Sequence, residues 1–338
     1  MQGRGRIFLG ILAVFAVVLF IAEYRARTAG PRIEPFAQSE GWGIPREEVY
    51  DSGLSSSSIP AIDAPAFISP SEADIFLYDE GEGVSLSLGG ETQFYPFQIL
   101  VWHMVVNDMI AGVPIVVTYD PLVGSAMVYD RRVEGRTLLF SVSGKLWNSN
   151  VLLLDRETGS LWPQTTGRAV NGEFLDRDLA PIGSEIVTWK KWKAQRTTGR
   201  VLSKNTGAVR DYTRNPYLGY EENRLVYFPL SRRDIRLHPK ELVFGYTGPE
   251  GETKAYPREY LVEEGSITDT VLGRKVVMTF NENTGVLRAR GEDVAGVASD
   301  VFLRPMYWFA WAAIHPDTEL YDPLGEKQKV ESEQQEGE

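Results

Sequence analysis

Six polar residues of the sequence have side chains that could bind a ligand or take part in chemistry: His103, Asp120, Ser125, Lys145, Asn148 and Asn150. His103 follows Trp102 in a stretch expected to be helical, and Asp120 opens the turn in "TYDPLVGSAMVYD". An imidazole and a carboxylate at close range can hold a metal ion or exchange protons, so His103 and Asp120 form the candidate metal pair. Two alternatives stay open: a helix-face histidine bonded to backbone, and an aspartate that caps its own turn before Pro121.

The stretch "SGKLWNSN" places several hydrogen-bond donors between two apolar runs. Lys145, Asn148 and Asn150 could line a pocket for a small molecule, and a polar hairpin is the alternative that needs no ligand. The Gly-Lys pair lacks the other residues of a phosphate-binding loop. Ser125 follows Gly124, but neither a Gly-x-Ser-x-Gly nor a His-Glu-x-x-His motif is present. The sequence therefore marks a candidate binding site without a known catalytic motif.

The composition excludes several classes of site and partner. The chain of 338 residues contains no cysteine, so it forms neither a disulfide nor a cysteine-ligated metal centre. Its formal net charge of -11 at pH 7 argues against nucleic acid, and against an anionic membrane surface, as a partner. Hydrophobic residues make up 43% of the chain, which is enough for a sizeable core. The chain is globular, and its cofactor, if it has one, stays unknown at this point.

An unbroken apolar run, "IFLGILAVFAVVLFIA" at residues 7–22, follows two arginines near the start of the chain. Such a run is typical of an export signal or a membrane anchor. Arg27 and Pro31 suit a signal-cleavage site poorly, which favours an uncleaved signal-anchor, a transmembrane segment over residues 1–27. We expect a flexible linker at 28–60 and a disordered acidic tail at 324–338. The protein would cross the cell membrane once and hold its folded part outside the cytoplasm.

The region between linker and tail is expected to be mainly β with a few short helices. Short runs rich in β-branched and aromatic residues, such as "VPIVVTY" and "VLLLDRETGSLW", alternate with glycine-containing turns. This pattern is typical of strands joined by tight turns. Helices are predicted at Phe97–Val106 and Val187–Arg196. These elements place His103 on a helix and the turn after Asp120 between two strands.

An internal repeat divides this region into two related units, expected at 61–210 and 211–323. A shift of 161 positions aligns Gly90–Gly124 with Gly251–Gly285 without a gap, and twelve of the 35 aligned pairs are identical. Each copy is expected to close with a tryptophan-bearing helix and a strand. The four tryptophans that indicate this are Trp189 and Trp192 in the first copy, and Trp308 and Trp311 in the second.

The two copies differ at the candidate residues. His103 becomes Glu264, and Asp120 becomes Asn281. The positions that stay identical are mostly glycine, proline, tyrosine and apolar residues, which suit turns and core. We therefore expect the first unit to hold any functional site and the second to be a degenerate copy.

The first unit also resembles a known family. "YPFQILVWHMVVNDMIAGVPIVVTYDPLVGSAMVYDR" and "FSVSGKLWNSNVLLLDRETGSLWPQTTGRAVNGE", followed by "TWKKWK", are similar to the domain of unknown function 3179 (DUF3179), a group of mostly exported bacterial and archaeal proteins. The resemblance covers about 90–202 and implies no established activity. Members usually have Cys-Pro-Leu-Cys-Gly-Ser where this chain has Asp120-Pro-Leu-Val123-Gly-Ser125. Without these cysteines, this chain can carry out neither thiol redox chemistry nor thiolate binding of a soft metal at this turn.

These observations favour a membrane-anchored extracytoplasmic protein whose first unit is a non-catalytic binding or accessory module. Its partner would be a small molecule or another envelope protein, and not a nucleic acid. The alternative is a metal-dependent or other small-molecule enzyme with a reduced site around His103 and Asp120. A third interpretation, a purely structural envelope protein, predicts an exposed apolar patch for a partner.

Overall fold

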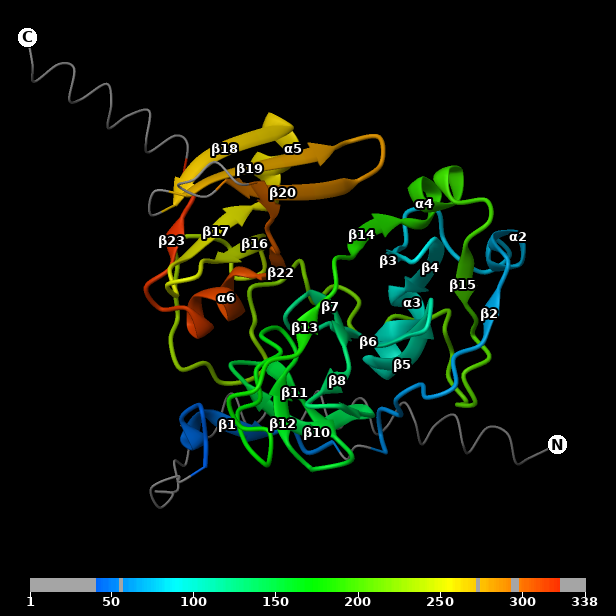
Figure 1. The fold of residues 1–338 in the computed structure, drawn as a ribbon, viewed down its shortest axis with the longest axis horizontal. Helices are drawn as coiled ribbons and strands as arrows, with labels where there is room; N and C mark the ends of the chain where they lie inside the picture. Colours follow the sequence, from blue (N-terminus) through cyan, green and yellow to red (C-terminus); the bar gives the residue numbers. More distant parts are fainter. Residues whose placement is uncertain (1–40, 55–56, 272–273, 293–297, 323–338) are drawn as a thin grey trace, which may run out of the picture.

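The computed structural model describes residues 41–54, 57–271, 274–292 and 298–322. These residues form mostly β-strands, together with five short α-helices and one 3-10 turn. Five sheets of four or five strands are arranged like the blades of a β-propeller, and one further sheet has two strands (Figure 1). The expected class, mainly β with a few short helices, is confirmed.

Two sheets build the first unit. Their elements, in chain order, are β2 (Phe67–Ile68), α2 (Pro70–Ala73), β3 (Glu82–Leu88), β4 (Glu91–Pro96), α3 (Phe97–His103), β5 (Val105–Ile110), β6 (Val113–Asp120), β7 (Ser125–Asp130), β13 (Ala180–Pro181), β14 (Glu185–Thr188), α4 (Trp189–Gln195) and β15 (Arg200–Leu202). The first sheet has the strand order β14-β3-β4-β15-β2, in which β15 runs parallel to β4. The second has the order β13-β7-β6-β5 and is antiparallel throughout.

A third sheet, called here the inserted sheet, combines one strand from the start of the described chain with three strands that lie in the chain between β7 and β13. It contains β1 (Val49–Asp51), β10 (Phe140–Trp147), β11 (Asn150–Asp155) and β12 (Leu161–Pro163), in that order across the sheet, and the small hairpin β8 (Arg132–Val133) and β9 (Arg136–Thr137) precedes it. This sheet has no counterpart among the described residues of the second unit. It carries the "SGKLWNSN" stretch and so supplies half of the candidate residues.

The second unit repeats the strand order of the first. Its elements are β16 (Leu242–Thr247), β17 (Thr253–Pro257), α5 (Arg258–Glu264), β18 (Ser266–Val271), β19 (Arg274–Asn281), β20 (Val286–Glu292), β21 (Ala298–Asp300), β22 (Arg304–Tyr307), α6 (Trp308–Ile314) and β23 (Glu319–Leu320). They form the sheets β22-β16-β17-β23 and β18-β19-β20-β21, and β23 runs parallel to β17, as β15 does to β4. The helix α5 begins and ends 161 residues after α3. The repeat read from the sequence is therefore a repeat of blade-like sheets.

The chain upstream of the first unit is partly built into the fold. The predicted signal-anchor at 1–27 and the acidic tail at 324–338 lie outside the described residues. Within the described ranges, no helix is long and apolar enough to span a bilayer. The linker expected at 28–60 overlaps β1, which pairs with β10 from Val49 opposite Trp147 to Asp51 opposite Lys145. A strand of three residues is too short to give a periodic signal in the sequence.

The two predicted helices are both shorter than expected, for local reasons. The helix predicted at Phe97–Val106 ends at His103, because Met104 has a φ of 60°, a left-handed conformation that ends a helix. The helix predicted at Val187–Arg196 begins at Trp189, because the Thr188 side chain accepts a hydrogen bond from the Lys191 amide and caps the helix. Each helix still connects the strands that the repeat predicts.

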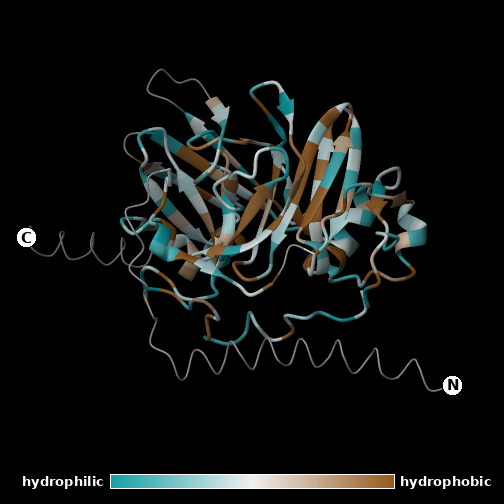
Figure 2. Cartoon of the chain, turned by 90° about the horizontal axis from the view of Figure 1, so that it is seen from below, coloured by the Kyte–Doolittle hydropathy of each residue, from teal (hydrophilic) through white to brown (hydrophobic). Residues whose placement is uncertain are grey.

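The largest hydrophobic core is shared by both units. It joins Trp162 of the inserted sheet to Trp308 and Trp311 of α6, and all three tryptophans are fully buried. Figure 2 shows the hydrophobic residues concentrated on the strands of the sheets. Because one core runs through both copies, the turn after Asp120 is packed from the second unit as well as from the first.

Candidate functional site

Asp120, the last residue of β6, is the centre of a buried network of hydrogen bonds. Its side chain is only 1% exposed. One carboxylate oxygen accepts from the Leu122 amide at 3.0 Å, which makes the tight turn predicted from Asp120-Pro121. The other oxygen accepts from the Val151 amide at 2.7 Å and from the Asn150 side chain at 2.9 Å. The carboxylate thus joins the β6–β7 turn to the start of β11.

Asn150 continues this network into the inserted sheet. Its side-chain nitrogen also donates to Gln164 at 3.2 Å, and its oxygen accepts from the Thr165 hydroxyl at 3.0 Å. Gln164 in turn donates to the Thr118 hydroxyl at 3.0 Å and to the Ser125 carbonyl at 3.3 Å. The network therefore closes on both strands of the β6–β7 hairpin.

The turn is covered by residues from the second half of the chain. Val123 is fully buried, and its carbonyl accepts a hydrogen bond from the Tyr307 amide at 2.7 Å. The Tyr220 hydroxyl donates to the Leu122 carbonyl at 3.0 Å. At Gly124 a side chain would meet the Tyr307 ring at 2.6 Å, so glycine is required for this close approach. The turn at which the family resemblance implies cysteines is here part of a packed interface.

The electrostatics of Asp120 follow from this burial. Removal from water raises the pKa of its carboxyl group to about 6, while the hydrogen bonds from Val151, Asn150 and Leu122 act in the opposite direction. Asp120 forms no ion pair with any lysine or arginine of the described residues. A pKa near 6 suits acid–base chemistry, but a carboxylate this buried does not reach a substrate. Its arrangement is that of a structural cross-link.

His103 lies in a different network. Nδ1 lies 2.7 Å from the Pro60 carbonyl oxygen and Nε2 lies 2.7 Å from the Tyr212 hydroxyl. The Tyr212 hydroxyl also lies 2.6 Å from that of Thr206. Burial lowers the pKa of His103, which favours the neutral ring with Nδ1–H donating to Pro60. With both nitrogens engaged, the ring ties α3 to two distant loops.

The side chains of His103 and Asp120 do not meet in one site. Their backbones lie close, because the Tyr119 amide donates to the Met104 carbonyl at 2.9 Å. The imidazole nevertheless hydrogen-bonds with Pro60 and Tyr212, whereas the carboxylate accepts hydrogen bonds from Asn150 and Val151 of β11. No group of three or more histidine, aspartate or glutamate side chains in the described residues is arranged to hold a metal ion. The predicted metal pair thus shares no hydrogen-bond partner.

The other candidate residues divide between the Asp120 network and the β10–β11 hairpin. Ser125 is paired with Asp120 across the β6–β7 hairpin, and its buried hydroxyl has no hydrogen-bond partner in the described residues. Lys145 lies half-buried on β10. Asn148 is in the hairpin turn with a φ of 50°, and its side-chain oxygen accepts from the Ser231 amide at 2.7 Å. The "SGKLWNSN" stretch is a polar hairpin, and its tip is covered by a later loop.

Two sets of buried polar residues were not found by sequence reasoning. Gln164 and Thr165 gave no signal, because they contact Asn150 only in the folded chain. The second set is repeated: the Tyr95 hydroxyl donates to Asp108 at 2.7 Å, and the Tyr256 hydroxyl donates to Asp269 at 2.8 Å. The alignment of the two copies contains this signal, since both the tyrosine and the aspartate are identical in each. Both pairs are structural ties between neighbouring sheets.

Comparison with known proteins agrees with the resemblance found in the sequence. No curated protein and no solved structure matches the chain. A family model described as "Protein of unknown function (DUF3179)" matches residues 56–318, which run from before β2 to the end of α6 and so include most of both units and of the inserted sheet. The chain therefore belongs to the DUF3179 family.

Proposed function

We propose that this protein is a membrane-anchored extracytoplasmic module that binds a partner and catalyses no reaction of its own. The observation that carries the proposal is the state of Asp120. Its two oxygens accept hydrogen bonds from Leu122, Asn150 and Val151. The turn at which the family resemblance implies a pair of cysteines is used here to hold two sheets and the second unit together.

The donor set supports the absence of chemistry at this turn. A metal ion at Asp120 would have to displace hydrogen bonds from two backbone amides, and Val123 offers no ligand atom. His103 would have to give up Tyr212 or Pro60 to bind the same ion. Breaking buried hydrogen bonds without replacement costs about 1–3 kcal/mol for each group left unpaired, so the folded network opposes metal binding.

Metal analysis of the purified full-length chain tests this part of the proposal. The chain is equilibrated with Co²⁺ or Zn²⁺, passed over a desalting column and measured by elemental analysis beside His103→Ala. We expect neither protein to retain the metal. One equivalent of metal in the parent chain that is lost in His103→Ala would instead support the metal-dependent enzyme.

Membrane attachment is tested separately. The proposal rests on the apolar run at residues 7–22, and it predicts that alkaline carbonate leaves the full chain in the membrane pellet while detergent releases it. A chain from which residues 1–27 are removed serves as the control and should be found in the supernatant. Release of the full chain by carbonate would contradict the proposed anchor.

A further inference from the structure

A long connection, residues 203–240, joins the two repeat units without any helix or strand. Connections of this length without secondary structure are uncommon in compact domains and usually have a function. Several hydrogen bonds hold it on the domain, among them those from Trp102 to the Arg214 carbonyl, from Tyr220 to the Leu122 carbonyl, and from the Ser231 amide to Asn148. The connection is thus a fixed surface.

The charge of this connection is opposite to that of the protein. It contains eight lysines and arginines and four aspartates and glutamates, a net charge of +4, whereas the whole chain has -11. The rest of the chain therefore carries -15. The total charge, which argues against an anionic surface as a partner, hides this local excess of positive charge.

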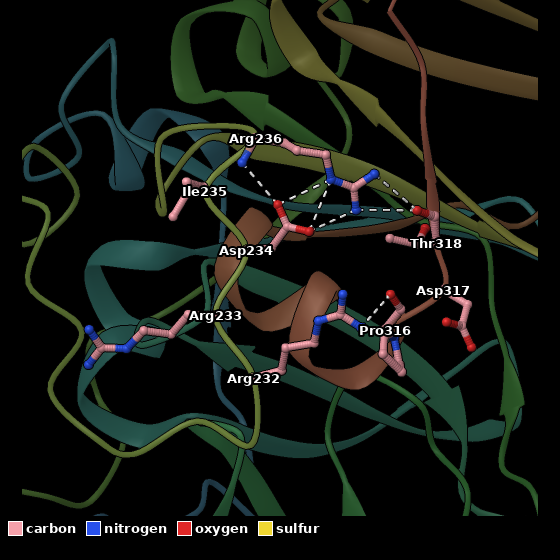
Figure 3. Close-up of a pocket in the computed structure, with 8 residues that line it drawn as sticks. All are labelled: Arg232, Arg233, Asp234, Ile235, Arg236, Pro316, Asp317 and Thr318. Atoms are coloured by element: carbon pink, nitrogen blue, oxygen red, sulfur yellow. Dashed lines mark hydrogen bonds and ion pairs between the residues drawn. The ribbon is translucent and has the colours of Figure 1, made fainter.

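The positive residues are most concentrated at 232–236. Arg232, Arg233 and Arg236 line an open hollow of about 430 Å³ together with Asp234, Ile235, Pro316, Asp317 and Thr318 (Figure 3). Asp234 is neutralised by Arg236 at 2.8 Å. Figure 3 shows Arg233 directed away from this pair, and it has no ion-pair or hydrogen-bond partner in the described residues. Among the residues that the structure describes, Arg232 is bonded only to the Pro316 carbonyl, at 3.0 Å. Among the described residues, neither Arg232 nor Arg233 is paired with a carboxylate, and Asp317 is the other acid that lines the hollow.

An aliphatic side chain lies between these arginines. Ile235 is 89% exposed, one of the most exposed large apolar residues of the described chain. The backbone around it is fixed, because Arg236 also donates to the Thr318 carbonyl at 3.3 Å and stacks over the Trp308 ring at 4.9 Å. An exposed aliphatic residue on a fixed backbone, with arginines before and after it in the sequence, suits a bilayer interface, where cations meet phosphates and the apolar side chain enters the acyl boundary.

This loop lies near the start of the described chain. Ser231 is bonded to Asn148 at the tip of the β10–β11 hairpin, and the neighbouring Trp147 pairs with Val49 of β1. The predicted anchor at 1–27 ends 14 residues before Gly41. An extended chain spans about 3.5 Å per residue, so the tether allows the loop to reach the membrane that holds the anchor.

We propose that residues 232–236 dock on the anionic headgroups of the membrane, with Arg232 and Arg233 binding phosphate groups and Ile235 inserted among the lipids. This proposal deepens the proposed membrane attachment and rests on it for the nearness of the bilayer. Docking would fix the orientation of the domain and leave its other faces free for a partner.

Site-specific labelling tests the docking directly, because the chain has no cysteine of its own. Full-length Ile235→Cys is labelled with a polarity-sensitive fluorophore and reconstituted in vesicles of phosphatidylcholine, with or without phosphatidylglycerol. Ile75→Cys is the matched control, since Ile75 is 85% exposed and lies on another part of the surface. We expect a blue shift and a several-fold gain of emission at 235, only with phosphatidylglycerol, and no change at 75.

The role of the arginines is tested in the same labelled chain. Arg232→Glu with Arg233→Glu should weaken docking at least about 25-fold, about fivefold for each arginine removed, and high salt should also reverse it. Equal emission in both vesicle types, an equal response at 75, or a response that survives the double substitution would overturn the proposal. So would a response to soluble polyglutamate in the absence of any response to vesicles, which would assign the loop to an acidic protein.

The anchor and the docking loop have separate readouts. Flotation of the chain with the vesicles at high salt reports the anchor, whereas the emission at 235 reports docking. A chain that floats without a response at 235 retains the anchor and rejects the docking. A chain that does not float but responds when phosphatidylglycerol vesicles are added retains the docking and rejects the anchor.

Discussion

The Asp120 carboxylate accepts a hydrogen bond of 2.9 Å from the Asn150 side chain, which lies 30 residues later in the sequence. This contact joins the β6–β7 turn of the first unit to the inserted sheet. It lies at the turn where the family resemblance implies a pair of cysteines. In this chain, buried hydrogen bonds to Asp120 hold that turn instead.

Replacement of Asp120 by asparagine should destabilise the protein by about 2–3 kcal/mol. The amide group has one acceptor oxygen, so its NH₂ would face the amide of Leu122, or those of Val151 and Asn150, donor against donor. The free energy of unfolding, from chemical denaturation, measures the loss. Asp178→Asn is the control, because the Asp178 side chain is 63% exposed and forms an exposed ion pair of 3.6 Å with Arg168. This substitution should change the free energy of unfolding by less than about 0.5 kcal/mol. Equal effects of both variants would contradict the structural role of Asp120.

Gly124→Ala should destabilise the protein more than Gly112→Ala. Both glycines have positive φ, 61° and 77°, so both substitutions cost about 1 kcal/mol in backbone strain. At Gly124 the new methyl group would meet the Tyr307 ring. At Gly112 no atom lies within 4 Å of the position that the methyl group would take. We expect an additional loss of about 2 kcal/mol at Gly124, measured by denaturation. A difference near zero would show that Tyr307 does not pack on the turn.

His103 should make the protein less stable in acid. Burial lowers its pKa in the folded state, so below about pH 6.5 the unfolded chain binds more protons at this residue than the folded chain does. Stability from His103 is therefore complete above this pH and falls as the pH decreases. Asp120 acts in the opposite direction, because its folded pKa of about 6 lies above the unfolded value and the folded chain gains protons first.

Comparison of the parent chain with His103→Gln separates the two groups, since the Asp120 contribution is present in both. The variant should be less stable at neutral pH, because glutamine does not reproduce both bonds of the ring. Its stability should also fall less steeply between about pH 7 and pH 5. Parallel pH profiles of the two proteins would mean that His103 is not held neutral by the fold.

Lys240→Met should loosen the connection between the units. The Lys240 side chain is buried, and its ammonium group donates to the carbonyls of Asn223 at 2.8 Å and Leu225 at 2.7 Å while it lies 3.6 Å from the centre of the Tyr220 ring. Loss of this cation should cost about 2–3 kcal/mol. Hydrogen exchange should rise first at residues 220–225. Lys190→Met, at an exposed pair with Glu80, should leave both stability and exchange unchanged.

The class, the repeat and the family could all be predicted from the sequence. Strands and turns follow from β-branched runs and glycines, which are local patterns. The 161-residue shift of the repeat predicts both ends of α5 from those of α3. The same alignment contains the Tyr95–Asp108 tie and its copy at Tyr256 and Asp269. The ends of α3 and α4 were less accurate, because they depend on the conformation of Met104 and on the Thr188 cap.

The partners of the polar residues were decided only by the tertiary structure. The sequence indicated that His103 and Asp120 are candidates, but the fold turns His103 to Tyr212, 109 residues away, and Asp120 to Asn150. It also gathers Arg232 and Arg233 beside Pro316 in one hollow. Local spacing fixes strands and turns, because these depend on neighbouring residues. Hydrogen bonds between distant segments depend on how whole sheets pack, and no local pattern contains that information.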